Sequence, residues 1–145
     1  MAARKIYVDI NVFIYWLANH PKFGETAKKW IREIERAPKG SYVTSSLTLY
    51  ETLVVIAGLT GRSLKDEIFV EEIIKAIMSL PGLKISPLTS EDLVEAVNLM
   101  REYELDYEDA IHLATSLRNN IKEVLSNDQD FDRTPLKRTF TLHSP

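Results

Sequence analysis

Short apolar runs alternate along this chain with longer segments in which apolar residues recur every three or four positions. The runs are typical of buried parallel strands, and the longer segments are typical of helices with one apolar face. The pattern predicts about five strands, at residues 4–9, 42–44, 83–86, 123–126 and 138–142. Helical segments separate most of these strands, so we expect a mostly parallel central sheet in a three-layer α/β/α sandwich.

The helical pattern begins directly after the first strand and returns between later ones. The predicted helices cover residues 11–18, 25–36, 46–59 and 63–80, a segment that opens at residue 89, and residues 106–121. Ser45 or Ser46 suits the N-cap of the third helix, which Gly61 would end, and Ser63 is the expected N-cap of the fourth. The chain has no internal repeat and no long linker, which predicts a single domain over residues 1–145.

Composition narrows the class of protein. Hydrophobic residues make up 45% of the 145 residues, enough for one sizeable core, and the absence of cysteine excludes disulfides and thiolate metal sites. The N-terminal apolar run is short and is broken by Asp9 and Asn11, unlike a signal peptide. No apolar stretch reaches the length of a membrane span. We therefore expect a soluble, cytoplasmic protein without a membrane partner.

Charge is distributed unevenly along the chain, although its net value is only −3. Residues 1–40 hold eight basic residues against four acids, whereas residues 63–135 hold sixteen acids against seven bases. A basic segment can dock a nucleic acid even in an acidic protein, because the local charge matters more than the sum. The alternative is that these charges simply solvate helix faces.

Two carboxylates lie in apolar surroundings where charged residues are rare. Asp9 follows the first strand and is the only charged residue between Lys5 and Lys22. Glu51 is the only charged residue in the segment 41–61, and helical spacing places it on the apolar face. Ionised carboxylates are rarely buried unless they are paired or bind a metal. Because no matching buried cation is predicted, the two acids suggest a shared metal ion.

Two further acids are expected at the same edge of the sheet. Asp109 lies in the first turn of the helix that Asp106 opens, and Asp128 comes just after the fourth predicted strand. Ligands of open α/β sheets bind outside the carboxyl ends of the strands. Asp9 and Asp128 follow strand ends, and the helix start at Asp109 opens toward the same edge, so these three carboxylates can converge.

Each acid also has a purely structural interpretation. Asp9 could cap the following helix, and Glu51 could reach solvent from the edge of its own helix. Asp109 could belong to a capping arrangement that begins at Asp106, and Asp128 could be a turn residue. Four independent structural roles are less economical than one site, so the pattern favours a metal centre.

Oxygen ligands without histidine or cysteine select Mg²⁺ or Mn²⁺ over zinc and copper. A cation of this kind activates a water molecule and neutralises phosphate charge, which suits hydrolysis of a phosphodiester. Without the cation, the carboxylates would repel a polyanion. The cluster therefore predicts activity that depends wholly on the divalent ion.

Four short motifs in this order resemble the PIN-domain family. The first strand ends in VDIN at residues 8–11, and a serine-rich helix start leads to a glutamate in TSSLTLYE at residues 44–51. An Asp-Ala pair opens a late helix in YEDAIHLA at residues 107–114, and SNDQDF follows at residues 126–131. Each motif is weak alone, but together they span most of the chain in the family's order.

The resemblance implies a Mg²⁺-dependent ribonuclease, with Mn²⁺ as a substitute, of the kind found as the toxin of VapBC-type toxin–antitoxin pairs. It implies an RNA substrate, a homodimer and a small antitoxin that plugs the active site. The residues to which it gives metal-binding and catalytic roles are Asp9, Glu51, Asp109 and Asp128. Asn11 and Ser126 would orient these carboxylates, and Asp130 could replace or assist Asp128.

Other interpretations remain open at this point. His112 could donate to substrate from one turn after Asp109, but such a histidine is more often a core or edge residue, and the role of Asp106 is undecided. An aspartyl-phosphate phosphatase usually has a second aspartate where this chain has Asn11. The main rivals are a PIN-like module that binds RNA or protein without cutting, and a housekeeping RNA-processing nuclease.

Overall fold

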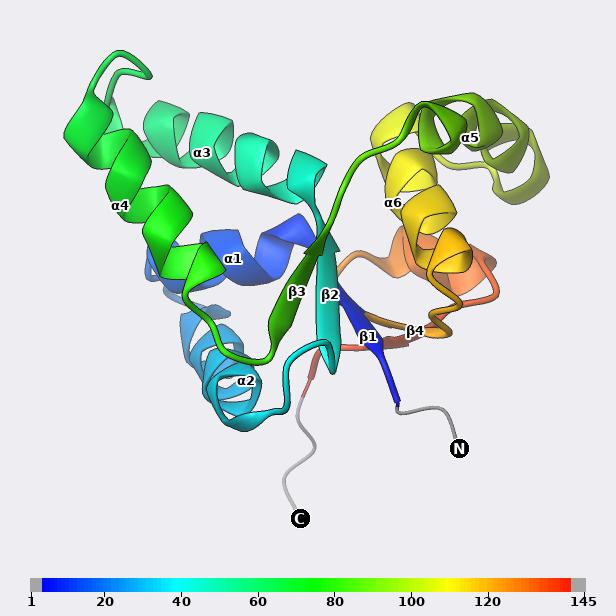
Figure 1. Ribbon diagram of the computed structural model, residues 1–145, viewed down its shortest axis with the longest axis horizontal. Coiled ribbons are helices and arrows are strands. Elements are labelled where there is room, and N and C mark those ends of the chain that lie inside the picture. Colours follow the sequence, from blue (N-terminus) through cyan, green and yellow to red (C-terminus); the bar gives the residue numbers. More distant parts are fainter. Residues whose placement is uncertain (1–3, 142–145) are drawn as a thin grey trace.

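Five short parallel strands form the central sheet of the computed structural model, which describes residues 4–141 (Figure 1). The strands are β1 (Ile6–Val8), β2 (Tyr42–Ser45), β3 (Leu83–Ser86), β4 (Glu123–Leu125) and β5 (Lys137–Thr139). Their order in the sheet is β3-β2-β1-β4-β5, and all four pairings are parallel. Because β1 lies in the middle, the side chains that follow it are covered from both sides.

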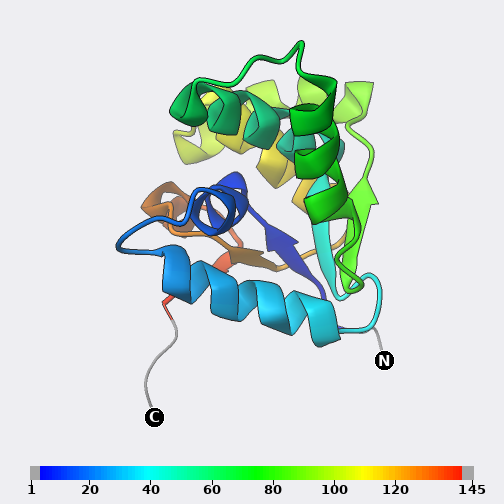
Figure 2. The ribbon, with the colours of Figure 1, turned by 90° about the vertical axis from the view of Figure 1, so that its left-hand side faces the viewer.

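Helices cover both faces of the sheet. One face carries α1 (Ile10–Leu17), α2 (Gly24–Arg36), α3 (Ser46–Thr60) and α4 (Glu67–Met78), which Figure 2 shows in front of the strands. The other carries α5 (Ser90–Tyr103), α6 (Tyr107–Arg118) and the short 3-10 helix η1 (Gln129–Arg133). The predicted α/β/α sandwich with a parallel sheet of five strands is confirmed. No helix within residues 4–141 is long and apolar enough to cross a membrane.

Alternation along the strands divides the core into two clusters. Val8 and Leu125 face the α1–α4 side, whereas Tyr7 and Val124 face α5 and α6. All four side chains are fully buried, and each contributes roughly 1.5–3 kcal/mol through removal of apolar surface from water. The strands need no polar face because helices cover both sides.

Strand register brings distant polar residues together at the carboxyl edge. Val8 pairs with Leu125, and the Asp9 amide donates to the Leu125 carbonyl at 3.0 Å. Asp9 and Ser126 therefore follow the paired ends of the adjacent strands β1 and β4 and lie side by side. No loop separates β1 from α1, because Asp9 is itself the N-cap of that helix.

Several predicted boundaries differ from the structure: β1 is shorter than the predicted strand at residues 4–9, and α6 ends at Arg118 rather than at residue 121. Asp66, not Ser63, is the N-cap of α4: its carboxylate accepts from the Phe69 amide at 3.1 Å, while the Ser63 hydroxyl accepts from the Lys65 amide in the preceding turn. The last strand is Lys137–Thr139 rather than 138–142, and Leu142 lies outside the described residues. Ser45 caps α3 and Gly61 ends it in a left-handed conformation, as expected.

Candidate active site

Asp9 is buried at the centre of the carboxyl edge, with only 2% of its surface exposed. One carboxylate oxygen accepts from the Ile10 amide at 2.9 Å, which is the capping role considered above. The other accepts from Asn11 Nδ2 at 3.1 Å and from the Ser126 hydroxyl at 2.7 Å. Burial raises the pKa of Asp9, although His112 and the Ser126 hydrogen bond oppose that rise. Capping and a place in a charged site are thus compatible in one residue.

Asn11 and Ser126 join the start of α1 to the loop after β4. Asn11 Nδ2 donates to the Ser126 hydroxyl at 3.1 Å, and Asn11 Oδ1 accepts from the Asn127 amide at 3.2 Å. The Ser126 hydroxyl also accepts from the Asp128 amide at 3.0 Å. These bonds hold the carboxylate of Asp9 and position the segment that carries Asp128.

Three carboxylates from two segments converge beside Asp9. Oxygen atoms of Asp109, Asp128 and Asp130 all lie within 4.8 Å of one another. Asp109 is placed by the first turn of α6, where its amide donates to the Asp106 carboxylate at 2.9 Å. Asp128 caps η1 by accepting from the Asp130 amide at 2.9 Å. The structural roles of Asp106 and Asp128 are therefore what bring the acids together.

The pKa of Asp109 shows that several negative charges lie close together at this site. Burial, followed by the negative charges of Asp128 and Asp9, raises the pKa of Asp109 to about 8. Asp128 also acts to raise the pKa of Asp9. Asp9, Asp109 and Asp128 therefore share one region of negative potential that a cation would relieve.

The donor set fits a hard divalent cation. All the candidate donors are carboxylate oxygens, and the oxygens bound to one such ion lie no more than about 4–5 Å apart. Asp109 and Asp128 form no ion pair with any residue of the described part of the chain. Asp130 is different, because its carboxylate pairs with Arg133 at 3.0 Å. Asp9 is not among the carboxylates that lie within 4.8 Å of one another, and it affects them through its charge. Within that group, Asp109 and Asp128 are better suited to a cation than Asp130.

Arg133 also links the two segments that carry these acids. Its guanidinium donates to the Tyr103 carbonyl at 3.1 Å and to the Glu104 carbonyl at 2.7 Å, at the turn between α5 and α6. The same side chain binds Asp130 in η1. The arginine thus fastens the loop after β4 to the turn that precedes Asp109.

Glu51 does not belong to the group formed by Asp109, Asp128 and Asp130, and it pairs with a buried histidine instead. Its carboxylate lies 2.7 Å from His112 Nε2, and the other ring nitrogen of His112 contacts the Tyr7 hydroxyl. His112 is 1% exposed. Burial opposes its charge, but contacts with Tyr7 and Glu51 raise the pKa of His112 well above the usual value. The expectation that Glu51 has no buried cationic partner is therefore wrong.

The network around Glu51 could not be found from one sequence motif. His112 follows Asp109 by one turn of α6, whereas Tyr7 is in β1 and Glu51 is in α3. The only sequence signal is the helical spacing, which places His112 on the same side of α6 as Asp109. In the structure His112 is a core residue that positions Glu51, the more common of its two interpretations.

The profile of the PIN domain matches residues 6–137. The chain therefore belongs to the PIN-domain family, since the match spans nearly the whole described part. A search of curated protein sequences gives no significant match.

Solved structures share the fold at low sequence identity. VapC20 of Mycobacterium tuberculosis, a sarcin–ricin loop cleaving toxin, has a TM-score of 0.71 at 18% identity, over 88% of this chain and 93% of that one. VapBC2 from Rickettsia felis, bound to a promoter DNA fragment, gives 0.66 at 16% identity, over 92% and 96%. A toxin–antitoxin complex from Klebsiella pneumoniae gives 0.63 at 22% identity, over 92% and 99%.

Proposed function

We propose that this protein is a divalent-cation-dependent ribonuclease and the toxin of a toxin–antitoxin pair. The observation that carries the proposal is the convergence of Asp109 and Asp128 beside the buried Asp9, at the edge where an open α/β sheet binds its ligands. Membership of the PIN-domain family and structural likeness to a sarcin–ricin loop cleaving toxin support it.

Asp9, Asp109 and Asp128 would hold a Mg²⁺ or Mn²⁺ ion. When bound, such an ion supplies an activated water and neutralises charge on the scissile phosphate. Asn11 and Ser126 keep the Asp9 carboxylate in place, and each of its oxygens already accepts at least one hydrogen bond. Asp130 would assist only after leaving Arg133.

Glu51 has a less direct place in the proposed site. His112 fixes its carboxylate. Burial acts to raise the pKa of Glu51, but the hydrogen bond and the charge of His112 outweigh it and leave the pKa below its usual value. Glu51 therefore stays an anion near neutral pH and can act through a bound water rather than as a direct ligand. Glu108, whose pKa is raised by Glu51, lies beside it.

An antitoxin partner and a homodimer belong to the same proposal. Toxin–antitoxin assemblies among the structural neighbours support the antitoxin. Exposed apolar side chains on α3 and α5, such as Val54, Leu59 and Val94, offer surfaces that a second copy or an antitoxin could cover.

The first prediction concerns dependence on the ion. Single-stranded RNA should be cut with Mg²⁺ or Mn²⁺ and spared with excess EDTA. Asp9→Asn, Asp109→Asn and Asp128→Asn should each abolish cutting and weaken Mn²⁺ binding in calorimetry, because residues that share one ion act as a unit. Asp130→Asn is the matched control and should be milder, since that carboxylate has Arg133 as a partner.

Two results would contradict the proposal. Cutting that survives chelation would exclude the cation as the source of the activated water. RNA binding without any cutting, in the presence of Mn²⁺, would favour the non-cleaving PIN-like module instead.

A further inference from the structure

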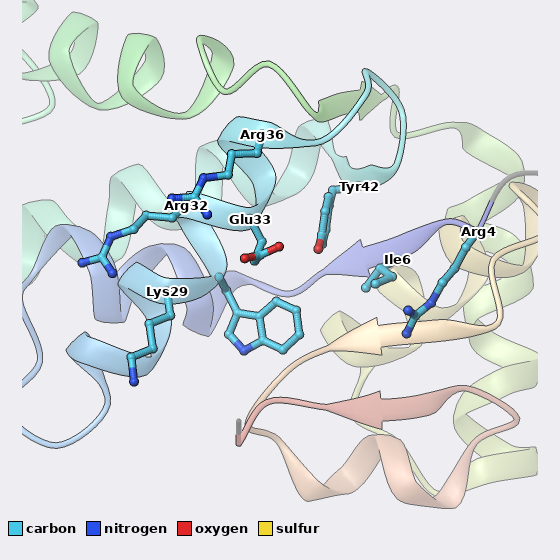
Figure 3. Close-up of a pocket in the computed structure, with 8 residues that line it drawn as sticks. Arg4, Ile6, Lys29, Arg32, Glu33, Arg36 and Tyr42 are labelled. Carbon is cyan, nitrogen blue, oxygen red and sulfur yellow. The ribbon is translucent and has the colours of Figure 1, made fainter. Parts of the chain in front are cut away.

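A second site candidate lies between α2 and the beginnings of β1 and β2, at the sheet edge opposite the carboxylates. It is a pocket of about 510 Å³ (Figure 3). Basic side chains form its rim, with three on α2 and one just before β1, and aromatic and aliphatic side chains line the interior. The lining residues are Arg4, Ile6, Lys29, Trp30, Arg32, Glu33, Arg36 and Tyr42.

The rim is positively charged and largely uncompensated. Lys29, Arg32 and Arg36 are exposed and form no ion pair within residues 4–141. Arg4 does have a partner, Glu123, at 2.6 Å. The chain has a net charge of −3, so three basic side chains without an ion-pair partner around one pocket form a local basic site.

The interior is aromatic and rigid. The Trp30 indole is half-buried, and its Nε1 donates to the Phe140 carbonyl at 2.8 Å, which fixes the ring in the pocket. Tyr42 is buried, and Ile6 completes the apolar wall. Aromatic side chains beside arginines are the combination with which proteins bind the bases and backbone of single-stranded nucleic acids.

Glu33 is the single acid of the lining, and Figure 3 shows its carboxylate pointing toward Tyr42. Burial and then the charge of Glu33 raise the pKa of Tyr42, which agrees with this closeness. Glu33 is exposed, so its carboxylate lies at the mouth of the pocket. There it would repel a phosphate but accept a hydrogen bond from an exocyclic amino group, as Glu does from cytosine. Phosphates are therefore expected on the basic side chains, and the base is expected to enter the pocket beside Glu33.

We propose that this pocket binds one nucleotide of single-stranded RNA at a distance from the cleavage site, with its base beside Trp30, Tyr42 and Glu33 and its flanking phosphates on Lys29, Arg32 and Arg36. The volume of about 510 Å³ falls in the range of small-ligand sites. The inference rests on the proposed function for its choice of RNA. It favours cytosine over uracil, because uracil has no amino group for Glu33.

The experiment measures RNA binding in EDTA, so that its outcome does not depend on cleavage. Fluorescence anisotropy with labelled oligocytidylate of about 15 nucleotides would compare the wild-type chain with Arg32→Gln/Arg36→Gln. The control is Lys65→Gln/Arg101→Gln, which removes two exposed charges elsewhere. We expect the pocket pair to weaken binding about tenfold and to reduce the salt slope by about 1.4, the value for two phosphate contacts. The control pair should change affinity less than about twofold.

A second comparison tests the base. Oligocytidylate should bind about fivefold more tightly than oligouridylate, and Glu33→Ala should remove the difference while thermal unfolding stays cooperative. Equal weakening by the two charge pairs would overturn the site in favour of general charge attraction. An acidic peptide that displaces the RNA at matched charge would overturn the choice of RNA.

Discussion

At the scale of single residues, the candidate site combines capping and charge. Asp9, Asp106 and Asp128 each cap a helix or helical turn, and Asp9 and Asp128 belong to the candidate site as well. The sequence could predict Asp9 and Asp128 because both follow strands, and Asp109 because it opens a helix. It could not predict that Glu51 pairs with His112, because that contact joins helices on opposite faces of the sheet. The ligand roles themselves stay predictions.

The pKa of Asp109, about 8 in the folded chain against 3.8 ordinarily, makes stability depend on pH. Between these values the folded protein holds a proton that the unfolded chain has lost, so stability falls as pH rises from about 4 to about 8. Without metal, Asp109→Asn should be more stable than wild type at pH 8, by about 2 kcal/mol because solvent screens a half-buried carboxyl.

Urea unfolding in EDTA over this pH range measures the difference. The advantage of Asp109→Asn should shrink toward pH 4, and Glu72→Gln, on an exposed stretch of α4, should show no such trend. A pH-independent gap between Asp109→Asn and wild type would contradict the electrostatic explanation.

At the scale of elements, short apolar runs predicted every strand and helical periodicity predicted most helix positions, because the central strands are buried on both faces and the helices on one. Helix boundaries were harder to predict where two nearby residues could each act as the N-cap. Ser63 and Asp66 both suit an N-cap, and the choice of Asp66 is accompanied by its ion pair with Arg62 at 2.9 Å. The sequence also could not predict contacts between elements: the Gly82 amide, just before β3, donates to the Ile34 carbonyl in the last turn of α2 at 2.9 Å.

Gly82 should therefore tolerate no side chain. A Cβ there would lie 2.4 Å from the Ile34 carbonyl oxygen and 2.9 Å from Ala37 Cβ. Gly82→Ala should lower the free energy of unfolding by about 2–3 kcal/mol, since α2 must move away from β3. Gly58→Ala is the matched control: it lies inside α3 with nothing within 4 Å, and it should stabilise by up to about 1 kcal/mol. Denaturant midpoints that agree for the two variants would refute the close approach.

At the scale of the whole molecule, charge is separated between the two edges of the sheet. Carboxylates gather at the ends of β1 and β4, and the basic rim lies where β1 and β2 begin. The uneven charge of the sequence indicated a basic first third, but its focus on α2 required the folded structure. The layers are also joined across the carboxyl edge, because His112 on α6 connects Tyr7 of β1 with Glu51 of α3.

The contact between His112 and Glu51 should stabilise the fold by more than the two side chains would separately. His112→Gln should destabilise the protein by about 3 kcal/mol, because it leaves Glu51 without its buried partner. Glu51→Gln should cost less, since a neutral amide still accepts a hydrogen bond. A double-mutant cycle from urea unfolding should give a coupling energy above about 1 kcal/mol. Additive effects would show that the pair is not energetically linked.

The arginine at the end of η1 has a consequence for how a cation is taken up. Arg133 ties the loop after β4 to the carbonyls of Tyr103 and Glu104, so the two acid-bearing segments are already joined in the folded chain. In the proposed function these segments would hold a cation, and little conformational entropy would remain to be lost when their carboxylates close around it. Uptake and release of that ion would then need no folding step in either direction.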